Sequence, residues 1–212
     1  MSQRWVAFFA AVFLTSVPVF FQAPLVRLWP EFSLIFTANW LIISILLMRN
    51  AKTHFWGDML LGFTWSWLAG SIYWGWLRWE PLWHLPVEAI GVPFVCFCLY
   101  RGWNRVGGLF YLGSLFGTVV TDCYFYATDL IPSWRQLMQV DPALALPIFQ
   151  SAIQHISNPW GVLWAIEFVA ILMGVGLAAL QSKQSCWWAF SGAVLSTILV
   201  DSLFLVAAAF AG

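Results

Sequence analysis

The sequence predicts an all-α, polytopic transmembrane helix bundle of about seven spans, formed by a single integral membrane domain over residues 1–212. The first observation is composition, since 62% of the residues are hydrophobic and only 8% are charged. Soluble domains carry roughly 25% charged residues, so this chain cannot cover a water-soluble fold. The second is the length of the apolar stretches, because a helix needs about 20 apolar residues to cross a bilayer.

Seven stretches satisfy that length, and the sequence predicts one span from each. In chain order they are 5–25, 33–49, 57–77, 83–100, 107–130, 160–180 and 186–210. The first follows Arg4, as the apolar region of a secretory signal follows a cation. However, the apolar run continues to Phe21, and Gln22, Ala23 and Pro24 make a poor cleavage site, so we expect a true span. The third begins near Asp58, where an acid complements the helix dipole, so we expect Asp58 to cap its own helix.

The connection between the fifth and sixth spans is the longest and contains an amphipathic helical segment at about 133–157. Ser133 and Gln136 have the spacing of a capping box, and Asp141-Pro142 is expected to end the first helix. Apolar residues from Ala145 onward recur at helical spacing and predict a second helix. This segment either serves as a passive interfacial linker or caps the bundle as a lid that gates access from the outer leaflet.

The cations predict the orientation of the chain. With seven spans, six cations fall on one side and three on the other. The larger group is Arg4, Arg49, Lys52, Arg101, Arg105 and Lys183, and the smaller is Arg27, Arg78 and Arg135. Cytoplasmic loops are enriched in Lys and Arg, so the N-terminus is predicted to be cytoplasmic and the C-terminus to lie outside. Tryptophans near both sets of span ends, Trp134 among those on the outer side, are interpreted as interfacial belts.

Several functional classes find no support in the sequence. The chain has no Lys/Arg-rich run and no glycine-rich nucleotide loop, so we expect no nucleic-acid partner. The four cysteines lack the spacing of a zinc site or a disulfide framework and are interpreted as packing residues, and we expect no metal. The expected partners are membrane lipids, with a membrane protein complex or a lipophilic pigment as alternatives. The sequence identifies no cofactor.

Four carboxylates inside predicted spans are the main candidates for ligand binding or proton handling. They are Glu88, Asp122, Glu167 and Asp201, and each Glu precedes its Asp by 34 residues. Charged side chains in hydrocarbon are costly and usually face a bundle interior. Topology places all four in the outer half, with His84 and Arg78 near the same edge, so a shared polar cavity is predicted. The alternatives are that each acid only hydrogen-bonds a neighbouring helix, and that Arg78 and Glu80 form a local ion pair.

The two acidic hairpins also suggest a parallel two-helix repeat at an offset of 79 residues. Both later helices contain a small-x-x-x-small pair, Gly113 with Gly117 and Gly192 with Ser196. Parallel repeats occur in some transporters. The small pairs independently predict close helix packing.

Extended runs of this chain, VPVFFQAPLVRLWP and GFTWSWLAGSIYWGWLRWEPLWHLPVEAIG among them, resemble a family of cyanobacterial integral membrane proteins known only as a domain of unknown function. That resemblance spans nearly the whole chain and implies a thylakoid or plasma membrane. A second, local resemblance joins Pro86, Val87 and Glu88, with Asp58 upstream, to membrane-embedded lycopene cyclases. It implies acid-base chemistry without a redox change, although Ala89 replaces an acid common in those enzymes.

Three classes of function remain, and none has a complete catalytic motif. The leading hypothesis is a non-catalytic membrane protein that assists assembly of a complex or handles a lipophilic pigment, quinone or lipid. The second is an enzyme that uses a buried carboxylate for acid-base chemistry on an isoprenoid or lipid. The third is a small proton-coupled transporter.

Overall fold

The computed structural model describes residues 2–141 and 144–210, and these are helical with no β-strand. The α-helices are α1 (Gln3–Leu28), α2 (Pro30–Met48), α3 (His54–Ile72), α4 (His84–Glu88), α5 (Val92–Tyr100), α6 (Arg105–Ala127), α7 (Ile131–Gln139), α8 (Ala145–Ile156), α9 (Pro159–Leu180) and α10 (Ser185–Phe210). Three short turns complete the list: the π-helical η1 (Tyr73–Leu77) and the 3-10 turns η2 (Pro81–Trp83) and η3 (Ala89–Gly91). The predicted all-α bundle is confirmed.

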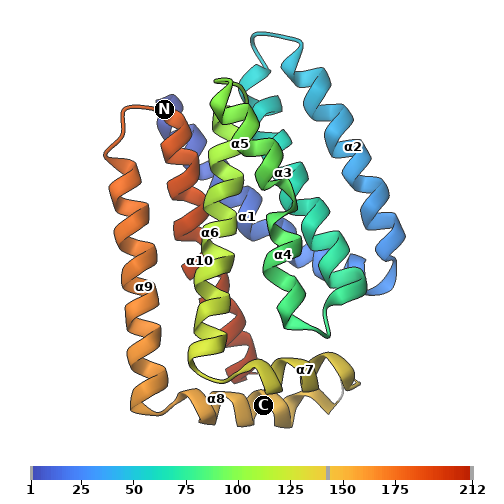
Figure 1. Ribbon diagram of the computed structural model, residues 1–212, viewed down its shortest axis with the longest axis vertical. Helices are drawn as coiled ribbons and strands as arrows, with labels where there is room; N and C mark the ends of the chain where they lie inside the picture. Colours follow the sequence, from blue (N-terminus) through green and yellow to red (C-terminus); the bar gives the residue numbers. More distant parts are fainter. Residues whose placement is uncertain (1, 142–143, 211–212) are drawn as a thin grey trace.

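Six segments of the described chain are long and apolar enough to cross a membrane. They are Gln3–Leu28, Pro30–Met48, Pro81–Tyr100, Arg105–Ala127, Pro159–Leu180 and Ser185–Val206. The stretch predicted at 57–77 corresponds to α3 and η1, which run between the two ends of the bundle beside α2 (Figure 1). The side chains of α3 are mostly buried against α2 and α6, so this helix needs fewer apolar groups to face lipid.

The bundle is organised around α10 and α6, which pack against each other. α10 also contacts α1 and α9, and α6 also contacts α3. Small residues make these approaches close: a Cβ added at Gly113 would lie 2.6 Å from the carbonyl oxygen of Phe190, and one at Gly192 would collide with the backbone of Phe8. The packing role predicted for the small residues is therefore confirmed.

The two helices of the long connection lie across one end of the bundle (Figure 1). Trp134 of α7 and Ile148 of α8 are buried beneath them, so these helices cap the bundle. The predicted capping box at Ser133 is wrong, because α7 begins at Ile131 and no side chain caps it. Pro132 occupies the first turn, where its missing N–H costs no hydrogen bond and its fixed φ favours helix initiation. The predicted stop at Pro142 lies outside the described residues.

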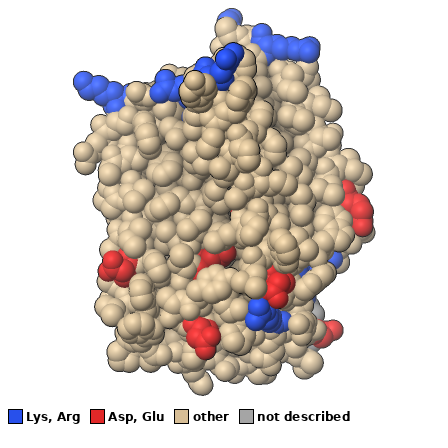
Figure 2. Space-filling model, viewed as in Figure 1, with Lys and Arg blue, Asp and Glu red and all other residues tan. Residues whose placement is uncertain are grey.

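Most of the basic residues lie at one end of the bundle. On the face drawn in Figure 2, Lys and Arg gather at the end where α1 begins, while the visible Asp and Glu lie in the other half with further basic side chains among them. The chain starts at the basic end, and the capping helices α7 and α8 lie at the opposite end (Figure 1). This arrangement gives the bundle two chemically distinct ends.

Candidate functional site

The fourth pass is broken in its middle, between α4 and α5. Pro93 lacks an N–H and its ring conflicts with a helical carbonyl four residues earlier, so a continuous helix cannot form through Ala89–Gly91. Tyr111 of α6 compensates at the break: its hydroxyl donates to the Glu88 carbonyl oxygen at 2.5 Å and accepts from the Gly91 N–H at 3.1 Å. Backbone polar groups inside a membrane must find protein partners. Glu88 is thereby held at the end of a short, fixed helix.

His84 begins α4 and faces Asp122 of α6. Its Nδ1 lies 2.9 Å from both carboxylate oxygens of Asp122. Both residues are buried, with exposed fractions of 8% for His84 and 3% for Asp122. An ionised Asp122 accepts a proton from Nδ1, and Nε2 then faces the other direction.

Glu88 stands on the other side of the imidazole. Its Oε1 is 3.9 Å from His84 Nε2, a separation too long for a direct hydrogen bond. The two side chains are four residues apart on one face of α4, so their relative position follows from helix geometry. Glu88, His84 and Asp122 form the cluster that we call the His84 site.

Aromatic rings enclose the His84 site. The imidazole centroid is 4.4 Å from Tyr73, 5.4 Å from Trp134 and 5.7 Å from Trp74. Trp74 and Trp134 are stacked at 5.9 Å with an interplanar angle of 4°. Tyr73 and Trp74 belong to the π turn η1, and such turns occur often at functional sites. These rings exclude water from one side of the imidazole.

Arg78 supports this aromatic wall. Its carbonyl oxygen accepts from Trp134 Nε1 at 3.0 Å, and its guanidinium Nη1 donates to the Trp74 carbonyl at 3.1 Å. In the described part of the chain its side chain pairs with no carboxylate. The predicted local pair with Glu80 is wrong, because Glu80 binds Arg135 of α7 instead, with Oε1 and Nη2 2.8 Å apart. This ion pair lowers the pKa of Glu80 and fastens α7 over the site.

The other two acids lie outside the His84 site. Asp201 accepts from the Thr121 hydroxyl at 2.8 Å and is exposed on the surface of the helices. Glu167 is exposed on α9 and makes no hydrogen bond or ion pair within residues 2–141 and 144–210. The structure thus brings Glu88, Asp122 and His84 together but leaves Glu167 and Asp201 outside their cluster. The second copy of the suggested repeat has no equivalent of the His84 site, and the repeat itself stays a prediction.

Asp58 corrects a further expectation. Its two carboxylate oxygens accept from the N–H groups of Val106 and Gly107 at 3.1 Å each, so it caps α6 and not its own helix. This contact lies where α6 begins, at the basic end, whereas α4 and the His84 site lie in the other half (Figure 1).

Sequence reasoning overlooked the aromatic part of the site. Trp134 was interpreted as an interfacial belt residue, and the structure buries it against His84. Tyr73, Trp74 and Tyr111 carried no signal beyond being aromatic in an apolar stretch. The break in the fourth pass had one: Pro86, Gly91 and Pro93 within eight residues indicate a discontinuous helix.

Together, the fold and the site define a multi-pass helical membrane protein with a buried carboxylate–histidine–carboxylate cluster. Residues 11–209 match the family of proteins of unknown function called DUF3120, and the chain belongs to this family. This confirms the resemblance to a family of unknown function, while the cyanobacterial origin and the cyclase resemblance stay predictions. Neither the curated proteins nor the solved structures gave a match. Within the described residues, no group of three or more His, Cys, Asp or Glu side chains is arranged to hold a metal ion.

Proposed function

We propose that this protein binds a lipophilic molecule carrying a hydroxyl or carbonyl group, such as a quinone, an oxygenated pigment or a lipid, at the His84 site. The observation that carries the proposal is the 3.9 Å separation between His84 Nε2 and Glu88 Oε1. One ligand oxygen, or one water molecule, bridges two such groups when it bonds to both. The pair offers a nitrogen and a carboxyl group to a single oxygen atom of the ligand.

Asp122 sets the orientation of the His84 imidazole. By accepting the Nδ1 proton it fixes the imidazole ring and favours a basic Nε2. The protonation states of His84 and Glu88 then determine which of them donates to the ligand and which accepts. The site is therefore suited to exchange a proton with the molecule it binds.

The surroundings favour an apolar and flat ligand. Tyr73, Trp74 and Trp134 present ring faces and edges around the imidazole. Leu82, Trp83 and Ile90 flank His84 and Glu88 on the exposed side of the fourth pass, with exposed fractions of 60%, 54% and 45%. This apolar surface faces the lipid phase and supports entry of the ligand from the bilayer.

The proposed location follows the charge pattern. The basic end is assigned to the cytoplasm by the positive-inside rule, which places the His84 site in the outer half of the membrane. In a cyanobacterial thylakoid or plasma membrane, that half adjoins the lumen or periplasm. An epitope tag placed in the loop between α2 and α3 tests this orientation by its accessibility in sealed vesicles.

An acid-base enzyme is the second candidate, and the Asp122–His84 hydrogen bond favours it. A histidine held by a carboxylate is a recurrent general acid or base, and Glu88 supplies a second proton carrier. The substrate would belong to the same ligand class. Incubation of the purified protein with an equimolar amount of the bound ligand separates the two candidates. An enzyme converts the ligand to a product, whereas a binding protein leaves it unchanged.

The first experiment is gentle purification of the full chain from its native membrane, followed by mass spectrometry of bound lipids, pigments and protein partners. Glu88→Gln and Glu167→Gln form a matched pair, because both remove one carboxylate from a spanning helix but only Glu88 faces His84. The wild type and Glu167→Gln are expected to retain the same ligand, and Glu88→Gln to lose most of it. Equal ligand content in both variants at equal thermal stability would contradict the proposal.

A further inference from the structure

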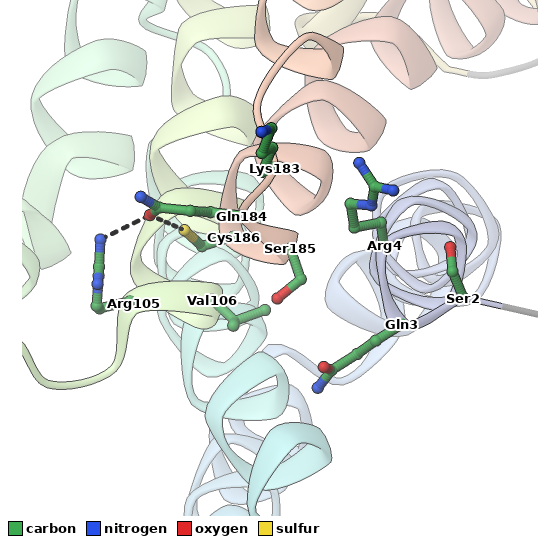
Figure 3. A pocket seen from close by; sticks show the side chains of 9 residues that line it. All are labelled: Ser2, Gln3, Arg4, Arg105, Val106, Lys183, Gln184, Ser185 and Cys186. Carbon is green, nitrogen blue, oxygen red and sulfur yellow. Dashed lines mark hydrogen bonds between the residues drawn. The ribbon is translucent and has the colours of Figure 1, made fainter.

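A hollow lies at the basic end of the bundle, where α1, α6 and α10 begin (Figure 3). Its volume is about 490 Å³. It is lined by Arg4 from α1, Arg105 from α6 and Lys183 from the loop before α10, together with Gln3, Gln184 and Ser185. We call it the basic pocket. It lies at the opposite end from the His84 site and takes no part in the function proposed above.

Three cations give the pocket a positive charge, and Asp58 contacts its lining by accepting from the Val106 N–H. No carboxylate lines it, and none of its three cations forms an ion pair in the described part of the chain. Arg105 Nη2 donates to the neutral Gln184 Oε1 at 2.8 Å, and the Arg4 guanidinium lies 5.4 Å from the centre of the Trp188 ring. These neutral contacts hold two of the cations in place and leave their charge available for an anion.

The starts of α1 and α10 add to the positive potential of the basic pocket, whereas the start of α6 does not. α1 and α10 start at the pocket, and the first N–H groups of a helix have no acceptor within it and carry partial positive charge. The first N–H groups of α6 are already bound by Asp58. α6 therefore contributes the Arg105 side chain and not its dipole.

An apolar surface leads away from the pocket along α1. Trp5, Phe9 and Phe13 follow one another at four-residue spacing, and their exposed fractions are 42%, 52% and 56%. Trp5 stacks on Phe9 at 5.6 Å and meets Trp188 edge-on at 4.8 Å, next to the Arg4 contact. A basic hollow at one end of a membrane bundle, continued by an exposed aromatic stripe, matches the two parts of an anionic lipid.

We propose that the basic pocket binds the phosphate headgroup of an anionic membrane lipid, with an acyl chain along the Trp5–Phe13 stripe. Arg4, Arg105 and Lys183 neutralise the phosphate, and Gln3 and Ser185 offer neutral hydrogen bonds. A tetrahedral oxyanion with three or more acceptor oxygens suits donors that come from several directions.

The test measures lipid bound to the full-length protein by native mass spectrometry after exchange into phosphatidylglycerol or phosphatidylcholine with the same acyl chains. The variant is Arg105→Gln with Lys183→Gln. Its control is Lys52→Gln with Arg101→Gln, which removes the same charge from the same end outside the pocket. Because two basic residues are removed, we expect the pocket variant to retain phosphatidylglycerol about tenfold less well, or worse. The control should change retention by less than about twofold.

Two outcomes would overturn the proposal. Equal losses in both double variants would mean that only the total charge of this end matters. Displacement of bound phosphatidylglycerol by millimolar inorganic phosphate, with no preference over phosphatidylcholine, would mean that the pocket holds a free anion. If the double variant does not fold, Lys183→Gln alone, at an exposed loop position, is expected to lower retention about threefold.

Discussion

His84 Nδ1 lies 2.9 Å from both carboxylate oxygens of Asp122, although 38 residues separate them and both sit inside apolar passes. Burial makes this contact costly to lose, because the imidazole would then keep no charged partner at hydrogen-bond distance in a poorly solvated place. Asp122→Asn preserves shape but removes the charge, and we expect it to lower the free energy of unfolding by about 2 to 3 kcal/mol. Denaturant unfolding of both proteins in detergent, monitored by circular dichroism, measures this change.

Asp201→Asn is the control for that substitution. Asp201 is also in a spanning helix, but it is exposed and bonds only to the Thr121 hydroxyl among the described contacts. We expect its replacement to cost less than about 1 kcal/mol. A loss at Asp201 as large as that at Asp122 would refute a special role for the buried histidine contact.

Trp134 links the capping helices to the His84 site. Its indole N–H donates to the Arg78 carbonyl at 3.0 Å, and its ring stacks on Trp74. Trp134→Phe keeps an aromatic ring but loses the hydrogen bond, so we expect a loss of about 1 kcal/mol and faster proteolysis between α7 and α8. Trp79→Phe, at a residue that is 47% exposed, should leave the proteolysis rate unchanged. Similar rates for both variants would show that α7 is held by other contacts.

The passes were predictable because apolar length is a local property of the sequence. Each predicted span corresponds to a helical pass within a few residues, including α3, where the composition is less apolar. The partners of the acids were not predictable in the same way. Glu88 and Glu167 follow the starts of their passes by similar distances, but the rotation of each helix about its own axis decides that one meets a histidine and the other stays exposed. That rotation depends on packing between helices distant in sequence.

Two predictions of helix caps from local sequence were wrong, one because of a neighbouring proline and one because of a contact distant in sequence. Ser133 has the residue type and spacing of a helix cap, yet Pro132 favours an earlier start, and α7 begins at Ile131. Asp58 stands near the start of α3, but its carboxylate accepts from the Val106 and Gly107 N–H groups in the first turn of α6. The prediction that Asp58 caps a helix was therefore correct, but the helix that it caps is α6 and not α3.

Close packing between α6 and α10 gives a sharper test of the fold. A Cβ at Gly113 would lie 2.6 Å from the Phe190 carbonyl oxygen, whereas one at Gly174 of α9 meets no atom within 4 Å. We expect Gly113→Ala to destabilise the protein by about 1 to 3 kcal/mol, because the helices must separate. Gly174→Ala should be neutral or slightly stabilising, since Ala favours a helix over Gly by about 1 kcal/mol. Thermal unfolding of both variants in the same detergent measures the difference. Equal melting temperatures would show that α6 and α10 do not approach each other closely at Gly113.

The ion pair between Glu80 and Arg135 predicts how the capping helices respond to pH. The hydrogen bond that Glu80 accepts from Arg135 lowers the pKa of Glu80 below its ordinary value of 4.5. A group whose pKa is lower in the folded state stabilises it above the ordinary pKa, and this contribution disappears as the pH falls through the lowered value. Attachment of α7 should therefore be constant between about pH 8 and 6 and weaken below about pH 4.

Hydrogen exchange of the α7 amides against pH measures this attachment, with Glu80→Gln as the control that lacks the titrating group. The variant should exchange faster at neutral pH and show a smaller acid-dependent rise than the wild type. High salt should reduce the difference between them at neutral pH, because the pair is partly exposed and salt screens it. Identical pH profiles for wild type and variant would assign the docking of α7 to the buried Trp134 contacts alone.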